Sequence, residues 1–527
     1  MILGLLLLPL GHTTFEACLR SQLPASTPLL VPGDEDYLPA SQCLNRRSDI
    51  APSPVAVVRV QSVSDVQHVV RCAGEFGLEV STRCGAHSFE NESCRGQVII
   101  DVSDLLDFSY DSDTQQTTWG SGHTSGELYM KLGALNVTVP GGMEGDVGTA
   151  GLWLGCGRGP FTQYMGNSCR RLQAVEYVDD AGHVRVANVT ENSDMLWMAR
   201  GAGGEFPGVV TKFTALAAPK PTTIHTRACD RYGAFFVGQA VIREWARGLE
   251  ETARSRRKMY SYIHFFPNTG MIWVRHKCFD CDADDLAWFI WKTSAIAQAA
   301  GGQCGDVKDH SIGPHPDQFV NFLAVEPGVG NKWETLLRKP HDWPGNNKDI
   351  FSTKGTSGSY YVHSYDASKG LLDAVWEVIY NDPVATIAGG YVQQLFLYSV
   401  ESDALGPQDN VGEAYNGHPA KWVFHFRMAW REDVNIQNDN DEQQESTVSN
   451  ENILSEHQLS AETPKAIAES AMLNHSHRLS TEMSKHLPCS GFYNYFDTEL
   501  PCVKSREELL AAYFSDPRRP FAQPYVA

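Results

Sequence analysis

The sequence lacks a block of basic residues, an internal repeat and, beyond its first residues, any long apolar run. Lys and Arg number 43 against 63 Asp and Glu, which gives a net charge of −20 at pH 7. Because nucleic-acid binding depends on cationic side chains that neutralise phosphates, this balance argues against a nucleic-acid partner, and it also argues against docking on an anionic membrane surface. The 527 residues, 42% of them hydrophobic, suffice for roughly two to four domains with large cores.

The N-terminus carries the one conspicuous apolar run, Met1-Ile-Leu-Gly-Leu-Leu-Leu-Leu-Pro-Leu10. It is shorter than the roughly 20 residues that a membrane-spanning helix needs. It fits the apolar part of a signal peptide over residues 1–20, although the usual basic residues before it are missing. The sequence has 13 cysteines and four Asn-x-Ser/Thr sequons, at Asn91, Asn136, Asn188 and Asn474. Disulfides need an oxidising compartment, so we expect a secreted protein or one of the secretory pathway.

The region from residue 50 to 219 alternates short strands and helices. Residues 55–60, 78–82 and 98–102 are expected strands, and residues 64–76 form a capped helix with apolar residues on one face. This order predicts an α/β unit. Residues 173–178 and 183–186 flank Asp-Asp-Ala-Gly and predict a β-hairpin.

After Pro219-Lys-Pro221 the apolar pattern becomes longer and alternating, as in an antiparallel sheet. The expected strands are 259–266, 271–276, 391–400 and 422–430, with helices at 286–300 and 370–380. The polar, acidic residues 437–446 predict a surface loop. The expected fold class is therefore α+β, with two domains.

Two glycine-rich segments are the first candidates for ligand binding. Arg83-Cys84-Gly85-Ala86-His87-Ser88 follows a strand, where small residues let backbone amides approach an anion and Arg83 adds positive charge. A diphosphate would fit, but an ordinary strand-end turn with a solvated histidine explains the pattern as well. Residues 139–159 contain eight glycines in 21 residues, which suits backbone packed against a flat or phosphorylated ligand. Neither a Walker loop nor a Rossmann glycine fingerprint is present.

Two further segments complete a recognisable set. They are Trp197-Met-Ala-Arg-Gly-Ala-Gly-Gly-Glu-Phe-Pro-Gly-Val-Val-Thr211 and Phe492-Tyr-Asn-Tyr-Phe-Asp497. In order and content the four segments resemble the vanillyl-alcohol-oxidase-type flavoproteins, which have an FAD-binding domain of the p-cresol methylhydroxylase type. Within that family the chain looks most like the berberine bridge enzyme-like oxidases, which carry Arg-x-Gly-Gly-His-Ser and a late Tyr-x-Asn-Tyr-x-Asp. The resemblance is close in the FAD region and loose over residues 220–430.

The resemblance implies a two-domain flavoprotein. Its FAD-binding domain, made of two α/β subdomains, would span residues 50–219. An antiparallel-sheet substrate domain would span 220–485, including the loop 437–446, and residues 486–527 would return to the FAD domain. A covalent bond would join His87 to the 8α-methyl group of the flavin and raise its redox potential. The implied cofactor-binding residues are Arg83, Cys84, Gly85, Ala86, His87, Ser88, Gly142, Asp146, Val147, Gly148, Thr149, Gly151, Gly155, Gly157, Val210 and Asn494.

The chain also departs from the family pattern. Many members carry Cys-Pro-Thr-Val-Gly, whose cysteine bonds the flavin C6, whereas here Glu144-Gly145-Asp146 precedes Val147. Glu144 occupies the cysteine's place, so no 6-S-cysteinyl link is expected. Ala86 replaces the second glycine of the first motif.

Alcohol oxidation by a flavin needs a protein base beside the cofactor that takes the hydride. The family's Asn-Tyr motif assigns the base to Tyr495, with Asn494 as its orienting neighbour; a wall residue is the alternative. A second candidate is His425, which strand alternation places on one face with Arg427. A structural histidine is the alternative there.

The expected function is oxidation of an alcohol, of a sugar or a secondary metabolite, with O2 as acceptor and H2O2 as product. The alternatives are a dehydrogenase with another acceptor and a flavin-binding protein without turnover. No metal is expected, since no second pair follows Cys278-Phe-Asp-Cys281 at zinc-finger spacing, which favours a disulfide or plain thiols there. Cys84 and Cys156 lie in turns expected to contact the cofactor and are expected to be unbridged. The family resemblance implies a Cys18–Cys94 bridge.

Overall fold

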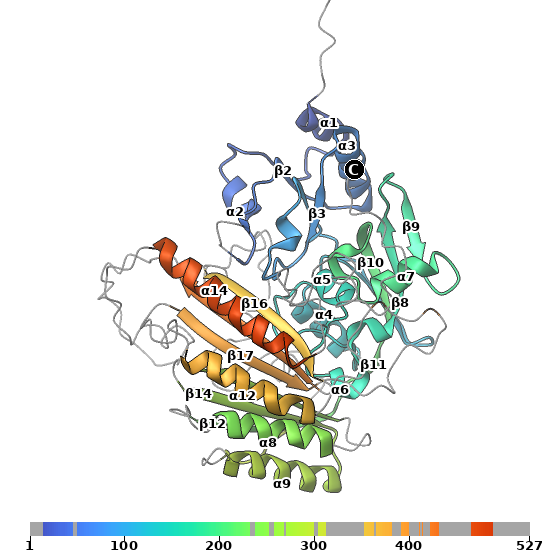
Figure 1. Ribbon diagram of the computed structural model, residues 1–527. Coiled ribbons are helices and arrows are strands. Elements are labelled where there is room, and N and C mark those ends of the chain that lie inside the picture. Colours follow the sequence, from blue (N-terminus) through green and yellow to red (C-terminus); the bar gives the residue numbers. More distant parts are fainter. Residues whose placement is uncertain are drawn as a thin grey trace, which may run out of the picture.

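The computed structural model describes part of the chain. It comprises residues 14–45, 50–231, 238–251, 258–267, 270–299, 304–311, 353–362, 365–381, 391–399, 411, 414, 422–431 and 465–487. The described strands form three main sheets (Figure 1). The first two lie together in the upper half of the figure, and the third, with its helices, lies below them.

The first sheet has the order β1-β2-β4-β3, with β1 Leu29–Leu30, β2 Ala56–Arg59, β4 Val98–Asp101 and β3 Val80–Arg83. Strands β2 and β3 both run parallel to β4. Helix α3 (Val63–Phe76) connects β2 to β3; the Ser62 side chain caps its first turn and Gly77 ends it in a left-handed conformation with φ 63°. The sheet thus has the α/β pattern that the sequence predicts.

The second sheet is antiparallel, with the order β5-β6-β10-β8-β9. Its strands are β5 Phe108–Asp111, β6 Gln116–Gly120, β10 Val209–Leu216, β8 Leu172–Val178 and β9 Val184–Ala187. The predicted hairpin is confirmed as β8 and β9. The helices α4 (Ser125–Ala134), α5 (Thr149–Leu154) and α7 (Ser193–Ala199) belong to this part of the chain, and a capping box formed by Thr124 and Glu127 begins α4.

The third sheet has seven strands, all paired antiparallel, in the order β15-β12-β14-β13-β17-β18-β16. Its strands are β15 Lys308–Ser311, β12 Thr223–Arg231, β14 Met271–Phe279, β13 Met259–Phe266, β17 Tyr391–Ser399, β18 Trp422–Arg431 and β16 Thr353–Val362. The helices α8 (Gly238–Glu251), α9 (Ala283–Ala299), α12 (Tyr365–Asn381) and α14 (Lys465–Ser484) lie side by side along it (Figure 1). The expected α+β class, with an antiparallel-sheet domain beside an α/β part, is confirmed.

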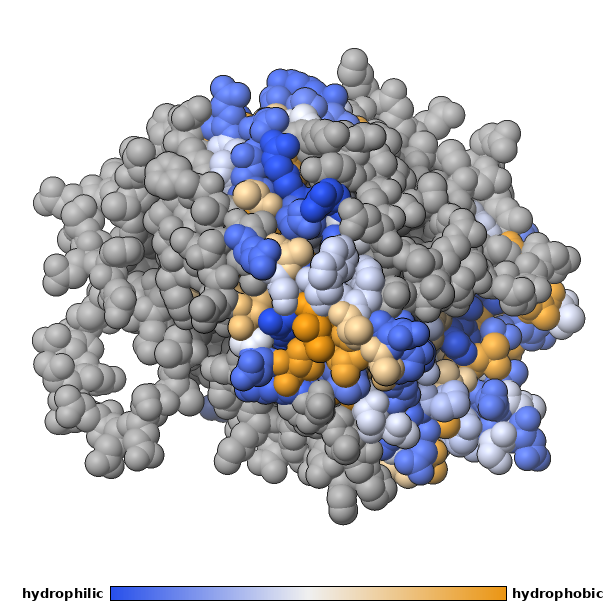
Figure 2. Space-filling model, turned by 90° about the horizontal axis from the view of Figure 1, so that it is seen from below, coloured by the Kyte–Doolittle hydropathy of each residue, from blue (hydrophilic) through white to orange (hydrophobic). Residues whose placement is uncertain are grey.

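The helix layer ends at α9, the lowest helix in Figure 1. Seen from that end, the surface has an apolar patch among polar residues (Figure 2). On α9, Ile290 and Trp291 are 41% and 59% exposed. Within the described part of the chain, no helix combines the length and apolar character that a bilayer crossing would need.

Five disulfides join ten of the cysteines in the described part of the chain. They are Cys18–Cys72, Cys43–Cys94, Cys156–Cys169, Cys229–Cys304 and Cys278–Cys281. The predicted Cys18–Cys94 bridge is wrong, because α1 (Phe15–Gln22) packs on α3 and brings Cys18 to Cys72 instead.

Two other cysteine predictions have opposite outcomes. The expectation that Cys156 is unbridged is wrong, since the turn after α5 places it against Cys169. Cys84 is buried outside any disulfide, as predicted. Of the alternatives for Cys278 and Cys281, the structure has the disulfide.

Candidate functional site

The two glycine-rich segments, which are far apart in the sequence, meet backbone to backbone. A Cβ atom on Gly85 would lie 2.2 Å from the amide nitrogen of Gly148, and a Cβ on Gly148 would lie 2.3 Å from that of Gly85. Any side chain at either position would force the segments apart. The second segment is also held by its own backbone, since the Thr149 amide donates to the carbonyl of His123 at 2.9 Å. The contact therefore requires glycine at both places.

His87 and Asp146 face each other where these segments meet. Nε2 of His87 lies 3.2 Å from Oδ1 of Asp146, and their side chains are 19% and 14% exposed. Burial acts to raise the pKa of Asp146, but the charge and contact of His87, with a backbone hydrogen bond, outweigh it and hold that pKa below its ordinary value. Asp146 is therefore a carboxylate at neutral pH.

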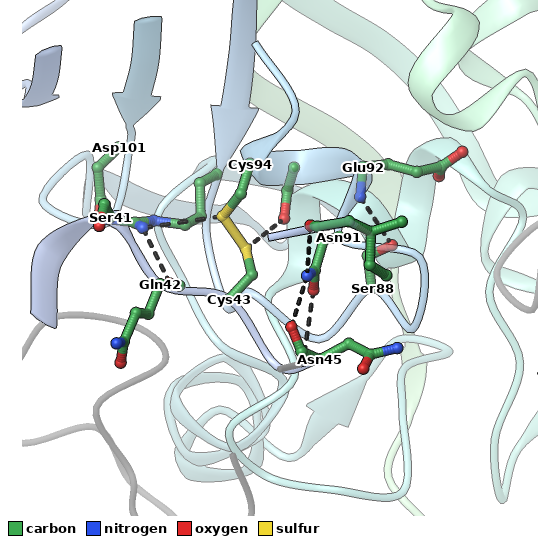
Figure 3. Close-up of a disulfide and its surroundings, with 12 residues drawn as sticks. Ser41, Gln42, Cys43, Asn45, Ser88, Asn91, Glu92, Cys94 and Asp101 are labelled. Atoms are coloured by element: carbon green, nitrogen blue, oxygen red, sulfur yellow. Dashed lines mark hydrogen bonds and ion pairs between the residues drawn. A yellow bond between two sulfur atoms is a disulfide. The ribbon is translucent and has the colours of Figure 1, made fainter. Parts of the chain in front are cut away.

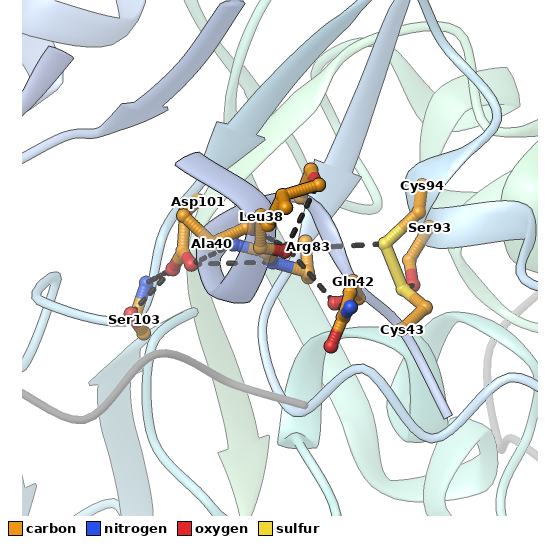
Figure 4. Close-up of polar contacts among 10 residues, drawn as sticks. Leu38, Ala40, Gln42, Cys43, Arg83, Ser93, Cys94, Asp101 and Ser103 are labelled. Atoms are coloured by element: carbon orange, nitrogen blue, oxygen red, sulfur yellow. Dashed lines mark hydrogen bonds and ion pairs between the residues drawn. A yellow bond between two sulfur atoms is a disulfide. The ribbon is translucent and has the colours of Figure 1, made fainter. Parts of the chain in front are cut away.

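The Arg83 side chain lies in the core rather than at the predicted anion site. Its Nε and Nη2 donate to Oδ2 of Asp101 at 3.2 and 2.7 Å, and Nη1 donates to the carbonyls of Ala40 and Gln42 (Figure 4). Both side chains of the ion pair are fully buried. The prediction that the Arg83 charge faces a diphosphate is therefore corrected: the guanidinium fixes the start of the turn, because parallel pairing of β3 and β4 places Asp101 beside it.

The other end of the turn is tied to residues 43–45 (Figure 3). The Cys43–Cys94 disulfide joins the two segments. The Asn45 amide donates to Oδ1 of Asn91 at 3.0 Å, and Nδ2 of Asn91 donates to the Asn45 carbonyl at 2.6 Å. The Ser88 hydroxyl accepts from the Glu92 amide at 3.2 Å. Asn91 is thus fully buried, so this sequon is structural in the folded protein.

The remaining predicted cofactor residues of this region differ in their exposure to solvent. Gly151 is exposed, and a Cβ there would have no atom within 4 Å, so its surface is open to a ligand. Gly157 instead packs inside, since a Cβ there would lie 2.3 Å from Cγ of Leu152. The buried predicted residues are Cys84, Ala86, Gly142, Gly148, Thr149, Gly155, Gly157 and Val210. Gly85 and Val147 are partly buried.

Ala86 shows why the family has glycine at this position. Its φ is 58°, in the left-handed region that glycine adopts without a steric penalty. The turn keeps that conformation despite the alanine, and the Ala86 carbonyl accepts from the Leu44 amide at 3.2 Å. The substitution has therefore not changed the backbone path that the motif requires.

His425 lies on β18 at the boundary between the two parts of the molecule. It is buried, and its ring centroid is 6.1 Å from that of Phe89, two residues beyond His87. On the opposite face of the strand, Trp422 contacts Trp245 of α8, with ring centroids 5.7 Å apart. The fold thus turns His425 toward the His87 turn. The other predicted catalytic residue, Tyr495, and the predicted cofactor-binding residue Asn494 lie outside the described residues.

The supporting residues of the turn could not be found from motif spacing alone. Asp101 carries a usable signal, because it lies near the end of the predicted strand 98–102, and Arg83 directly follows the predicted strand 78–82. For Asn45 and Asn91 the sequence gives no signal that they pair, apart from the sequon at Asn91. The contact between His87 and Asp146 depends on two predicted segments packing together, which neither segment reveals by itself.

The residues at this junction fit a flavin. A flat ring needs a surface with few side chains and a polar edge, and Gly151 and the partly exposed His87–Asp146 pair provide these. His87 also provides a nucleophilic nitrogen at the junction.

Comparison with known proteins agrees with this assignment. Residues 54–188 match a family model described as an FAD binding domain, and these residues fall inside the predicted 50–219. An FAD-linked oxidoreductase of Penicillium ochrochloron is 32% identical over 221 residues, which are 40% of this chain and 49% of that protein. The chain thus spans about half the length of this curated relative.

Solved structures share the fold across nearly the whole chain. The BBE-like 1 protein of Physcomitrella patens has a TM-score of 0.71 at 19% identity, covering 95% of this chain and 94% of that one. Glucooligosaccharide oxidase from Acremonium strictum, described with a 6-S-cysteinyl, 8α-N1-histidyl FAD, has a TM-score of 0.71 at 18% identity with the same coverage. The predicted resemblance to FAD-linked, berberine bridge enzyme-like proteins is confirmed, and the chain carries an FAD-binding domain.

Proposed function

We propose that this chain is an FAD-linked oxidoreductase that oxidises an alcohol group of a sugar or secondary metabolite, with O2 as electron acceptor and H2O2 as product. The observation that carries the proposal is the junction of the two glycine-rich segments at His87. His87 would hold the flavin through its 8α-methyl group, and no second link is expected because Glu144 stands at the cysteine position. FAD, when bound, accepts the hydride. The oligosaccharide oxidase among the structural neighbours supports carbohydrates as the first substrate class to test.

We assign the domains accordingly. Residues 50–219 would bind the cofactor, residues 220–485 would contact the substrate, and residues 486–527 would close the site from the C-terminal side. The five disulfides in the described residues support an oxidising, secretory compartment. The partners are then a small-molecule substrate and O2.

Removal of the substrate's hydroxyl proton is assigned to Tyr495, oriented by Asn494, or to His425. An ordinary tyrosine has a pKa near 10 and needs a nearby cation or hydrogen bond to act as a base at neutral pH. An imidazole can accept a proton in that range without such help. His425 is supported by its place beside Phe89. Rapid-reaction kinetics of Tyr495→Phe and His425→Ala should separate them: the base is the residue whose loss slows flavin reduction by about 10²–10⁴-fold.

The covalent link is tested by acid precipitation of the purified protein. The wild-type pellet should stay yellow, whereas His87→Ala should release FAD into the supernatant. His183→Ala is the matched control, because that histidine is 58% exposed on the β8–β9 hairpin. A yellow supernatant from wild type would reject the link while leaving FAD binding intact.

The reaction is tested with a panel of oligosaccharides, simple alcohols and phenolic alcohols. Reduction is measured as bleaching of the oxidised flavin band at about 450 nm. Rapid reoxidation by O2 after bleaching supports the oxidase. Bleaching followed by slow reoxidation would instead indicate a dehydrogenase. A protein that binds FAD and is bleached by no member of the panel would be a flavin-binding protein without turnover.

A further inference from the structure

The Cys278–Cys281 disulfide differs from the other four in the length of chain that it closes. Its cysteines are 3 positions apart in the sequence, whereas the cysteines of the other bridges are 13 to 75 positions apart. In the chain-entropy account, the stabilisation that a disulfide gives a fold grows with the length of the closed loop. This bridge therefore contributes least to the global fold, and it can open without unfolding the domain.

One cysteine of this bridge is within reach of a reagent in solvent. Cys281, in the turn before α9, is partly exposed, whereas Cys278, near the end of β14, is fully buried. Both cysteines are buried in the Cys43–Cys94 and Cys156–Cys169 bridges, so a dissolved thiolate has no access to them in the folded protein. The two remaining bridges also have one partly exposed cysteine, but they close long loops. Among the described residues, only Cys278–Cys281 combines a short loop with an exposed cysteine.

Asp280, inside this loop, holds the chain where it enters the third sheet. Its Oδ1 accepts from the amides of Thr222 and Thr223 at 2.8 and 2.9 Å, and from their hydroxyls at 2.9 and 3.3 Å. The Asp280 amide donates to the Thr223 carbonyl at 3.0 Å. Thr222 directly follows Pro219-Lys-Pro221, and Thr223 begins β12. The disulfide loop thus fixes the crossing between the two parts of the molecule.

The closed loop keeps Asp280 in an uncommon backbone conformation. Its φ is 44°, in the left-handed region that residues with a Cβ occupy at a steric cost. The disulfide on either side restricts this residue, and Nζ of Lys258 donates to its carbonyl at 2.9 Å. An opened loop can relax toward an ordinary conformation, which would turn the Asp280 side chain away from Thr222 and Thr223.

Phe279, the other residue inside the loop, packs on the FAD-binding part. It is fully buried, and its ring centroid lies 5.1 Å from that of Phe161 and 6.3 Å from that of Tyr164. Tyr164 belongs to α6 (Thr162–Met165), and Phe161 follows the end of the glycine-rich segment 139–159. Both inner residues of the loop therefore contribute to the joint between the two parts.

We propose that Cys278–Cys281 is a redox-active disulfide that reacts with a dithiol reductant, and that its opening loosens the joint between the FAD-binding part and the third sheet. One thiolate of the reductant attacks Sγ of Cys281, the protein S–S bond breaks, and Cys278 leaves as a thiolate. The second thiolate then closes the S–S bond of the reductant and releases Cys281. Two electrons pass from the dithiol to the cystine, and two protons accompany them.

The first measurement identifies the bridge that opens. Purified full-length protein is treated without denaturant with a limiting amount of dithiothreitol, free thiols are blocked with N-ethylmaleimide, and each bridge is scored by peptide mass mapping. We expect Cys278–Cys281 to open while the other four bridges stay closed. Opening of Cys18–Cys72 or Cys229–Cys304 at the same or a lower dithiol concentration would overturn the proposal.

The second measurement is hydrogen exchange by mass spectrometry of the oxidised and the partly reduced protein. Exchange at residues 222–223 should become about 10- to 100-fold faster on reduction, the size expected for losing hydrogen bonds to a charged acceptor. The variant Cys278→Ser/Cys281→Ser should show the same rates without a reductant. The matched control is Cys18→Ser/Cys72→Ser, which removes a bridge with the same pattern of exposure between α1 and α3 and should leave these rates unchanged.

Asp280→Ala separates the carboxylate from the sulfur chemistry. With its disulfide closed, this variant should already exchange fast at residues 222–223, and dithiothreitol should add little. Wild-type rates that stay the same on reduction, or that rise throughout the molecule, would contradict a local joint. Should the double serine variant fail to fold, reduction of wild type still decides. Neither measurement requires turnover, so loss of the proposed oxidoreductase function would leave both results interpretable.

Discussion

Replacing Asp101 by asparagine should destabilise the first sheet and loosen the turn that carries His87. The Asp101 carboxylate is fully buried; it accepts from Nε and Nη2 of Arg83 and from the amide of Ser103 at 3.0 Å. A second guanidinium, that of Arg59, also interacts with it electrostatically. Asparagine keeps the shape of the side chain but leaves two buried arginines without their counter-charge.

The size of the effect follows from that burial. Breaking a buried ion pair by removing one partner costs about 3–5 kcal/mol, whereas an exposed pair contributes about 0–1 kcal/mol. The exposed pair of Glu16 and Arg20, with side chains 46% and 54% exposed, provides the control. Denaturant unfolding followed by tryptophan fluorescence should show a large decrease in the free energy of unfolding for Asp101→Asn and almost none for Glu16→Gln.

The pH dependence gives the same prediction a second measurement. Burial acts to raise the pKa of Asp101, but Arg83, then Arg59 and the Ser103 hydrogen bond, outweigh it and hold the pKa below its ordinary value. A carboxylate with a depressed folded-state pKa stabilises the fold above its unfolded pKa of about 3.9, and that stability is lost as the pH falls through the folded-state value. The difference in unfolding free energy between wild type and Asp101→Asn should therefore have its full value at pH 7 and decrease below about pH 4. A difference under about 1 kcal/mol at pH 7, or one unchanged down to pH 3, would refute the reasoning.

Three further outcomes follow from the same geometry. Gly148→Ala should lose FAD binding and unfold at lower denaturant concentration, because its Cβ would lie 2.3 Å from the Gly85 amide nitrogen; unchanged binding in a flavin titration would contradict this. Gly74→Ala, in the exposed face of α3 with no atom within 4 Å of its Cβ, should instead stabilise the protein by about 0.5–1 kcal/mol in the same unfolding assay. Glycopeptide mass spectrometry of secreted protein should find Asn91 unmodified, because it is buried against Asn45; a glycan there would contradict the described packing.

Local pattern was enough to predict the elements near the site. The helix expected from residue 64 begins at Val63 because Ser62 rather than Ser64 caps it, and its buried face is unchanged. Apolar period and capping are properties of neighbouring residues, so they can be read from a sequence. The same holds for the β8–β9 hairpin, which its turn residues indicate.

The side-chain partners could not be predicted in this way. Whether Arg83 turns outward to an anion or inward to Asp101 depends on the register of two parallel strands. The pairing of Cys18 depends on how α1 packs on α3, and cysteine spacing does not encode this. The motif at residues 83–88 therefore indicated a place where two segments meet, while the contacts of its side chains required the three-dimensional fold.

The attachment of the His87 turn to residues 43–45 bears on the order in which the protein matures. One side of that turn is joined to this earlier segment by the Cys43–Cys94 bridge and by the reciprocal bonds of Asn45 and Asn91 (Figure 3). Until these cysteines are oxidised, the turn lacks its covalent link to the N-terminal segment. We therefore expect oxidative folding to precede cofactor loading, so that a reducing environment would yield flavin-free protein even where FAD is abundant.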